Sequence, residues 1–201
     1  MAHDQLGEAL ARAGKREEAR AHFNAALRLN PNYPPSLSNM SQLLMSEGRF
    51  GEAAELLQRL VLSHPEHAVT HSDLAMALAH QGKAEEAISH YLEALRLRPS
   101  QPEILNNLAW LLATHPRGEL RDGMRAVSLA EKACDLTSRT NFWMLSTLAS
   151  AYAEAGKFPE AVATQEKVCS LSKEQGVPRQ QRESFEKRVE LFRSGQPYRQ
   201  P

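Results

Sequence analysis

Apolar residues in the first hundred positions of the chain recur every three or four residues, which is the spacing of one face of an α-helix. One such run ends at a glycine, and a second run follows it and ends at a proline. Glycine suits the left-handed residue that closes a helix, and proline stops the helix before it. The pattern therefore predicts pairs of helices joined by tight turns.

Three sets of equivalent residues keep one period of 34 positions through this region. They are the glycines Gly14, Gly48 and Gly82, the alanines Ala19, Ala53 and Ala87, and the prolines Pro31, Pro65 and Pro99. A fixed period of this length indicates a repeat protein whose units stack on one another. We place the first three repeats at residues 1–33, 34–67 and 68–101.

The second half of the chain carries the same pattern in a divergent form. A fourth repeat, 102–141, has the segment THPRGELRD inserted between its two helices, and a fifth, 142–175, regains the glycine and alanine marks. Residues 179–194 form an amphipathic segment in which Phe185, Val189 and Phe192 share one face. A terminal helix of this kind covers the open end of a repeat array. We therefore expect one all-α solenoid over residues 1–201 with a C-terminal capping helix.

The segments LGEALARAGKREEARAHFNAALRLNP and LAMALAHQGKAEEAISHYLEALRLRP resemble the tetratricopeptide repeat (TPR) family at nearly every signature position. This resemblance implies a right-handed α-α superhelix whose first helices line a concave groove. The segments NNLAWLLAT, AYAEAGKFPEAVA and FRSGQPYR resemble the C-terminal end of bacterial multi-repeat proteins, some of which carry membrane-embedded transferase domains.

Composition narrows the classes of partner. The chain has 24 basic and 24 acidic residues, so charge gives no reason to expect nucleic acid or an anionic membrane. Two cysteines, Cys134 and Cys169, are too few for a disulfide framework, and their positions predict core residues. No apolar run is long enough to cross a bilayer, and the first residues do not form a signal peptide. We expect a soluble, cytoplasmic protein, or alternatively the extracytoplasmic part of a membrane protein.

One polar position on the groove face recurs in every repeat. Its occupants are Gln5, Asn39, Asp73, Asn107 and Thr147. The two asparagines partly resemble the asparagine ladder of O-linked N-acetylglucosamine transferases, which grips a peptide backbone. An amide suits this role because it donates and accepts hydrogen bonds at once. The alternative is that these residues are solvated side chains on an exposed helix face.

Other groove positions indicate what a ligand would offer. Gln42, Met76, Trp110 and Trp143 face the same side, and tryptophan and methionine are favoured at binding surfaces. Alternatively, Trp110 is packed under the inserted loop. Acidic residues outnumber basic ones on this face, and the cationic clamp of chaperone-binding TPR domains is missing. The acidic residues are Asp4, Glu8, Asp73, Glu103 and Glu154. We therefore expect an extended, neutral to slightly basic peptide with apolar anchors.

Candidate chemistry is sparse elsewhere in the chain. His64, His67 and His71 lie close in sequence, and His67 and His71 have a spacing that zinc can use. No cysteine or carboxylate is placed to complete such a site, so we predict surface histidines and no metal. We find no catalytic residues and no cofactor motif. Interleaved glutamates make the C-terminal arginines a self-paired helix face rather than a nucleic-acid site.

The sequence therefore favours a non-enzymatic protein-interaction scaffold that binds an extended peptide or partner protein in its groove. A second hypothesis is that the chain is the accessory TPR segment of a larger enzyme, such as a membrane-bound glycosyltransferase, whose catalytic part precedes Met1. The chain starts at a repeat boundary without a polar cap, which favours a fragment, although a first repeat can also serve as its own end. Self-association through the exposed faces is a third hypothesis, which sedimentation would test.

Overall fold

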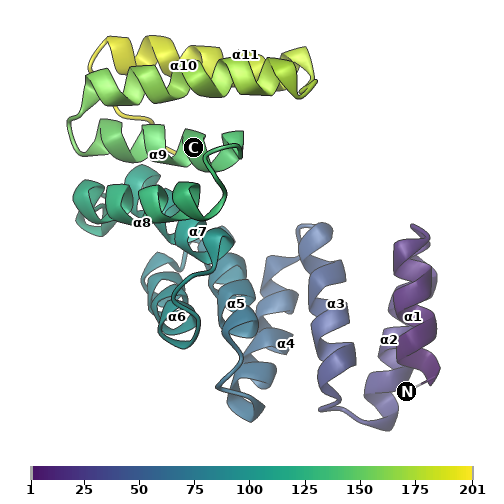
Figure 1. Cartoon of the computed structure of the whole chain (residues 1–201). Helices are drawn as coiled ribbons and strands as arrows, with labels where there is room; N and C mark the ends of the chain where they lie inside the picture. The colour runs from purple at the N-terminus through teal and green to yellow at the C-terminus, as the bar shows by residue number, and fades with distance from the viewer. Residues whose placement is uncertain (1, 201) are drawn as a thin grey trace. The chain divides into compact units, whose positions relative to one another are not determined.

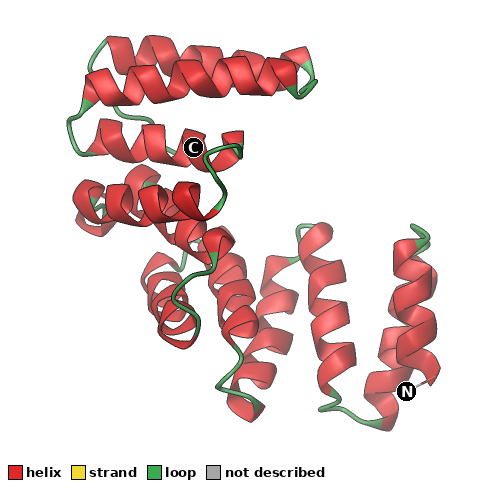
Figure 2. Ribbon diagram, in the orientation of Figure 1, coloured by secondary structure: helices red, strands yellow, loops and turns green. Residues whose placement is uncertain are grey.

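The computed structural model describes residues 2–200, which contain eleven α-helices, one short 3-10 helix and no strand (Figures 1 and 2). Ten of the α-helices form five antiparallel pairs, and the eleventh follows the last pair. The predicted all-α class and the five helix-turn-helix repeats are thus confirmed. The chain divides into two compact units, an N-terminal unit up to Arg98 and a C-terminal unit from Pro99.

The N-terminal unit consists of three helix pairs, each packed against the next along the chain. Its helices are α1 (Ala2–Arg12), α2 (Arg16–Leu29), α3 (Pro34–Ser46), α4 (Phe50–Ser63), α5 (Ala68–His80) and α6 (Ala84–Leu97). The alanines that mark the period, Ala19, Ala53 and Ala87, are all fully buried. A methyl side chain at this position lets the two helices of a pair approach closely. Leu6, in contrast, is 47% exposed, because the described chain has no repeat that packs in front of the first one.

The turn inside each pair shows why glycine keeps the period. Gly48 has a φ of +75°, in the left-handed region that other residues rarely adopt. The turn lets the backbone N–H of Arg49 reach back to the carbonyl oxygen of Leu44 at 2.9 Å. This bond satisfies a carbonyl that the end of α3 would otherwise leave free. Gly14 and Gly82 repeat the same geometry, as the sequence predicts.

The C-terminal unit contains two further pairs and the last helix. Its elements are α7 (Pro102–Thr114), the 3-10 helix η1 (Gly118–Leu120), α8 (Gly123–Leu136), α9 (Phe142–Glu154), α10 (Phe158–Glu174) and α11 (Arg179–Arg193). The predicted insertion lies between α7 and α8 and contains η1. It ends at Asp122, whose carboxylate accepts a hydrogen bond from the backbone N–H of Arg125 and caps α8.

The inserted loop brings the start of α8 into direct contact with the end of α9. A Cβ atom on Gly123 would lie 2.6 Å from the backbone nitrogen of Ala155. Beside this contact, the Nε atom of Arg121 donates a hydrogen bond to Glu154 Oε1 at 2.8 Å. The loop is therefore fixed by a backbone contact and an ion pair in addition to its short 3-10 helix.

Helix α11 covers the last pair with one apolar face. Phe185, Val189 and Phe192 are at most 6% exposed, and Glu186, Lys187 and Glu190 between them are exposed. Cys134 is also buried, as predicted, whereas Cys169 is only half-buried. Burial raises the pKa of the Cys134 thiol to about 11, so this thiol stays protonated and is a poor nucleophile at neutral pH. Within residues 2–200, every helix falls short of the length and apolar content that a membrane span requires.

Candidate functional site

The N-terminal unit has a hollow of about 400 Å³ between its first two helix pairs. Helix α3 contributes Asn39 and Gln42, so the structure brings together two of the predicted groove residues. The other lining residues are Glu8, Ala11, Arg12, Arg16, Phe23, Leu43 and Ser46. Charged and amide groups surround most of this hollow.

Asn39 is not a free amide in this hollow. Its Nδ2 atom donates to Asp4 Oδ1 at 3.2 Å, and the hydroxyl of Ser36 donates to the same oxygen at 2.7 Å. Asp4, predicted to be an exposed acidic group, is only 6% exposed. The amide of Asn39 thus holds two repeats together, and part of its hydrogen-bonding capacity is already used.

Asp73 and Met76 lie on α5, three residues apart, and both are half-buried. Burial raises the pKa of the Asp73 carboxyl from 3.8 to about 6, because a charged carboxylate loses hydration there. Glu8, at the corresponding face of the first repeat, instead forms an ion pair with Arg12. Asp73 is therefore an acidic group of this unit whose charge changes near pH 6.

The C-terminal unit contains a smaller cavity, of about 240 Å³, which we call the indole pocket. It is lined by Asn106, Asn107 and Trp110 of α7, by Trp143, Ser146 and Thr147 of α9, and by Arg188 of α11. Three predicted groove residues, Asn107, Trp110 and Trp143, thus meet in one place. Trp143 is 49% exposed, and the side chain of Asn107 makes no hydrogen bond within residues 2–200.

Trp110 contacts α11 and the segment after it, and no residue of the inserted loop lines the indole pocket. The guanidinium carbon of Arg188 lies 5.1 Å from the centre of its ring, and the ring of Tyr198 lies 5.7 Å away. The alternative that the loop packs on Trp110 is therefore replaced by contacts with α11 and the segment after it. The sequence pattern gives no indication of either partner, since contacts so distant in sequence leave no mark on a repeat.

Glu154 shows that part of the predicted acidic excess is neutralised. Its carboxylate pairs with Arg121 at 2.8 Å and with Arg199 at 2.6 Å, and its side chain is 13% exposed. One arginine comes from the inserted loop and the other from the segment after α11. The end of α9 therefore joins three parts of the chain.

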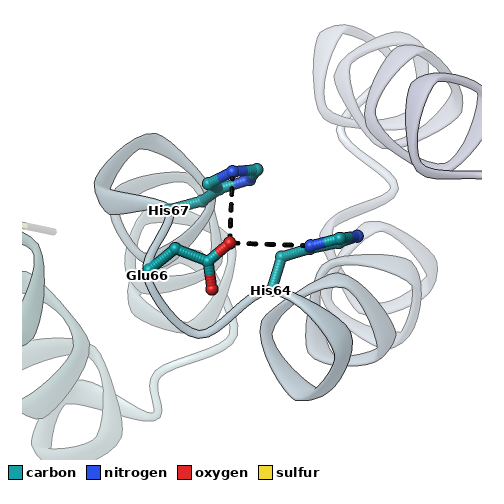
Figure 3. Close-up of side chains that lie close together, drawn as sticks. All are labelled: His64, Glu66 and His67. Atoms are coloured by element: carbon teal, nitrogen blue, oxygen red, sulfur yellow. Dashed lines mark ion pairs between the residues drawn. The ribbon is translucent and has the colours of Figure 1, made fainter.

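His64 and His67 lie at the surface in the turn between α4 and α5, as predicted, whereas His71 lies on α5 and differs from the prediction. His71 is buried, and its Nδ1 lies 2.9 Å from Nδ1 of His90 on α6, so it does not pair with His67. Glu66 stands between the other two, with Oε1 at 3.6 Å from His64 Nδ1 and at 3.5 Å from His67 Nε2 (Figure 3). The prediction that no carboxylate is placed near these histidines was therefore wrong.

The group His64, Glu66 and His67 offers two nitrogens and one oxygen within 4.8 Å of one another. Three ligands of this kind are found in open zinc sites. All three residues come from one short turn, however, and Glu66 and His67 are exposed. The backbone N–H of Glu66 and the nearby histidines lower the pKa of its carboxyl, which suits a carboxylate in a surface ion pair. We assign no metal to this group.

The chain resembles known repeat proteins in its sequence. Family models described as tetratricopeptide repeat match residues 1–33, 39–102 and 73–120, which is more than half of the chain. Anaphase-promoting complex subunit 7 of Arabidopsis thaliana is 32% identical over 84 residues, or 42% of this chain and 15% of that protein. The probable biofilm formation methyltransferase WspC of Pseudomonas putida is 34% identical over 90 residues, or 45% of this chain and 21% of that protein.

The chain thus spans less than a quarter of the length of either curated relative. Among solved structures, YrrB, described as a TPR protein with an unusual peptide-binding site, superposes with a TM-score of 0.69. The alignment covers 85% of each chain at 15% identity. At this identity the likeness concerns the fold alone.

Proposed function

Because the chain belongs to the tetratricopeptide repeat family, whose members act as protein-interaction scaffolds, we propose that it binds an extended peptide or a partner protein through the first helices of its repeats. The residues we assign to this role are Asn39, Gln42, Asp73 and Met76 in the N-terminal unit, and Asn107, Trp110 and Trp143 in the C-terminal unit. That the two units form one continuous solenoid also remains a prediction.

The observation that carries this proposal is the indole pocket. It combines two indole rings with the amide of Asn107, which has no partner within the described residues. Its volume of about 240 Å³ lies below the roughly 300–1,000 Å³ that is usual for small-molecule sites. Such a pocket fits one or two side chains of a peptide, with the amide free to bond the backbone beside them. The fold of YrrB, whose description includes peptide binding, is consistent with this use of the scaffold.

The charges of the assigned residues indicate which charge the partner peptide would carry. Asp73 is an acidic group on the corresponding face of the N-terminal unit, and its charge develops near pH 6. The other six residues assigned to this role are amides, indoles and a thioether, which carry no charge, and the guanidinium of Arg188 in the indole pocket lies against the rings of Trp110 and Tyr198. The partner we propose is therefore extended and neutral to slightly basic, with at least one apolar side chain for the indole pocket.

The test replaces Asn39 and Asn107 with alanine in the same chain. A partner is first captured on the intact protein, identified and purified, and its affinity is then measured by calorimetry. We expect the double variant to bind about tenfold more weakly, because a hydrogen bond to a ligand contributes about 1 kcal/mol and a tenfold change in affinity corresponds to about 1.4 kcal/mol. Since Asn39 already donates to Asp4, most of the loss should come from Asn107→Ala.

Asn24→Ala is the matched control, because Asn24 is an exposed asparagine on α2 that lines neither cavity. It should leave the affinity unchanged. If the double variant binds as tightly as the wild type while its circular dichroism spectrum is intact, the groove assignment is wrong.

The likeness to a methyltransferase over 90 residues favours a second candidate, namely an accessory repeat segment of a larger enzyme. The sequence alone favours a glycosyltransferase for this role, and the comparison adds methyl transfer as another reaction class. The complete reading frame distinguishes the two candidates. A catalytic domain or membrane-spanning helices encoded before Met1 would support the accessory role, and a reading frame limited to repeats would support the scaffold.

A further inference from the structure

The segment that follows α11 turns back across the C-terminal unit. Gly195 ends the helix with a φ of +70°, and residues 196–200, which we call the return segment, continue without regular secondary structure (Figure 1). The backbone N–H of Gln200 donates to the carbonyl oxygen of Thr114 at 2.9 Å. Thr114 is the last residue of α7, and carbonyls at this end of a helix have no partner within the helix. The return segment therefore supplies a hydrogen bond that α7 lacks.

The side chain of Tyr198 contacts Trp110 and Arg188, two residues that line the indole pocket. Its ring packs on an apolar cluster that contains Ala149, Ala153 and Phe192. The guanidinium carbon of Arg188 lies 4.2 Å from the centre of the ring. Arg188 and Trp110 line the indole pocket, and Tyr198 contacts both of them. The return segment therefore lies against the wall of the pocket. An extended ligand that enters the pocket along α7 would meet Tyr198.

Arg199 completes the set of contacts. Its Nη2 atom pairs with Glu154 Oε2 at 2.6 Å, and both side chains are largely shielded from solvent. Its Nη1 atom also donates to the carbonyl oxygen of Ala113 at 3.5 Å, at the end of α7. Glu154 remains paired with Arg121 on its other oxygen, so the carboxylate is held in place whether or not Arg199 is bound.

These contacts are the kinds that a bound peptide makes: a backbone N–H to a free carbonyl, an aromatic ring against a cation, and a guanidinium on a carboxylate. We propose that the return segment is an internal occupant of the peptide-binding face of the C-terminal unit. We further propose that the partner of this face carries an aromatic residue followed by arginine and competes with Tyr198 and Arg199. This inference rests on the proposed function and specifies the ligand of that site.

The return segment is suited to exchange with a ligand. Ordering its backbone costs conformational entropy at each residue, and the contacts that offset this cost come from Tyr198, Arg199 and Gln200. Pro197 limits the cost because its ring fixes φ before the segment binds. The balance leaves a segment that occupies the face when no ligand is present and that a ligand with the same contacts can displace.

The test uses the full chain with the single substitution Arg199→Glu, which places a carboxylate against Glu154 and releases the return segment. The probe is a fluorescein-labelled peptide with the sequence of residues 195–200, GQPYRQ, followed by fluorescence anisotropy. We expect the probe to bind the variant at least tenfold more tightly than the wild type, whose face is occupied. Peptides with alanine for the tyrosine, or with glutamate for the arginine, should bind the variant at least tenfold more weakly than the probe.

Tyr198→Ala in the full chain is a second way to release the segment and should also increase binding of the probe. Equal binding to wild type and both variants, binding to none of them, or equal binding of the altered peptides would each overturn the inference. The result is separate from that of the groove test. If Asn107→Ala weakens binding of the captured partner but the probe does not bind, only the proposal that the return segment is an internal occupant is refuted. If the probe binds but Asn107→Ala has no effect on the partner, only the groove assignment is refuted.

Discussion

Replacing Gly123 with alanine is expected to destabilise the C-terminal unit by about 3 kcal/mol. The added Cβ would lie 2.6 Å from the backbone nitrogen of Ala155 and 2.8 Å from the carbonyl carbon of Glu154. These are backbone atoms, so α8 and α9 must move apart as whole helices, and overpacking of this kind costs about 1–3 kcal/mol or more. Urea unfolding followed by circular dichroism measures the change.

Gly51→Ala is the matched control for this substitution. Gly51 lies in the first turn of α4, and a Cβ atom there would have no neighbour within 4 Å. Because alanine loses less conformational entropy than glycine in a helix, this variant should be more stable by up to about 1 kcal/mol. A Gly123→Ala variant as stable as Gly51→Ala would mean that the inserted loop does not bring α8 against α9.

Replacing Asp73 with asparagine is expected to stabilise the protein at neutral pH by up to about 3 kcal/mol. Burial raises the pKa of Asp73 from 3.8 to about 6, and a tenfold change in an acid dissociation constant corresponds to about 1.4 kcal/mol. Below pH 3.8 the carboxyl is protonated in both the folded and the unfolded state, so it does not lower the free energy of unfolding. As the pH rises from 3.8 through 6, only the unfolded state loses the proton readily, so the wild type loses stability over this window.

The measurement is the free energy of unfolding in urea at pH 5 and at pH 7.5. The difference between Asp73→Asn and the wild type should grow between these values, because the asparagine cannot ionise. Asp4→Asn is the control, since the Asp4 carboxylate accepts hydrogen bonds from Ser36 and Asn39 that hold it in place. That variant should not be stabilised at pH 7.5. A constant difference for Asp73→Asn across the two pH values would contradict the assignment of a buried, titrating carboxyl.

The fold could be predicted because its rules are local and repeated. The turn at Gly48 needs only the left-handed conformation of one residue, and the close approach at Ala53 needs only a methyl side chain. The same requirements return in each repeat, so a single sequence contains several independent copies of them. The amphipathic face of α11 is a local signal of the same kind.

The candidate site was predictable only in part. Helical spacing is enough to place Asn107 and Trp110 on one face of α7, but it does not reveal what else packs against them. Arg188 and Tyr198 contact Trp110 although they lie 78 and 88 residues after it in the sequence. The repeat pattern gives no signal for contacts over such a separation. Asn39 was predicted to be free because its partner Asp4 lies 35 residues earlier, in another repeat. Contacts between repeats depend on side-chain conformations that the pattern does not specify.

The position of the return segment at the end of the described chain affects the order of events during synthesis. The hydrogen bond from Arg199 to Ala113 joins residues 86 positions apart, whereas α7, α9 and Glu154 are all translated before residue 196. Chains are made at about 5–20 residues per second, and repeats can fold as they emerge. Arg188, which lines the indole pocket, precedes Tyr198 by only ten residues, so at this rate the pocket and its internal occupant are made within about 0.5–2 s of each other. The return segment therefore competes with a partner for this face almost from the moment the pocket forms, and a partner must displace it whether it binds during synthesis or afterwards.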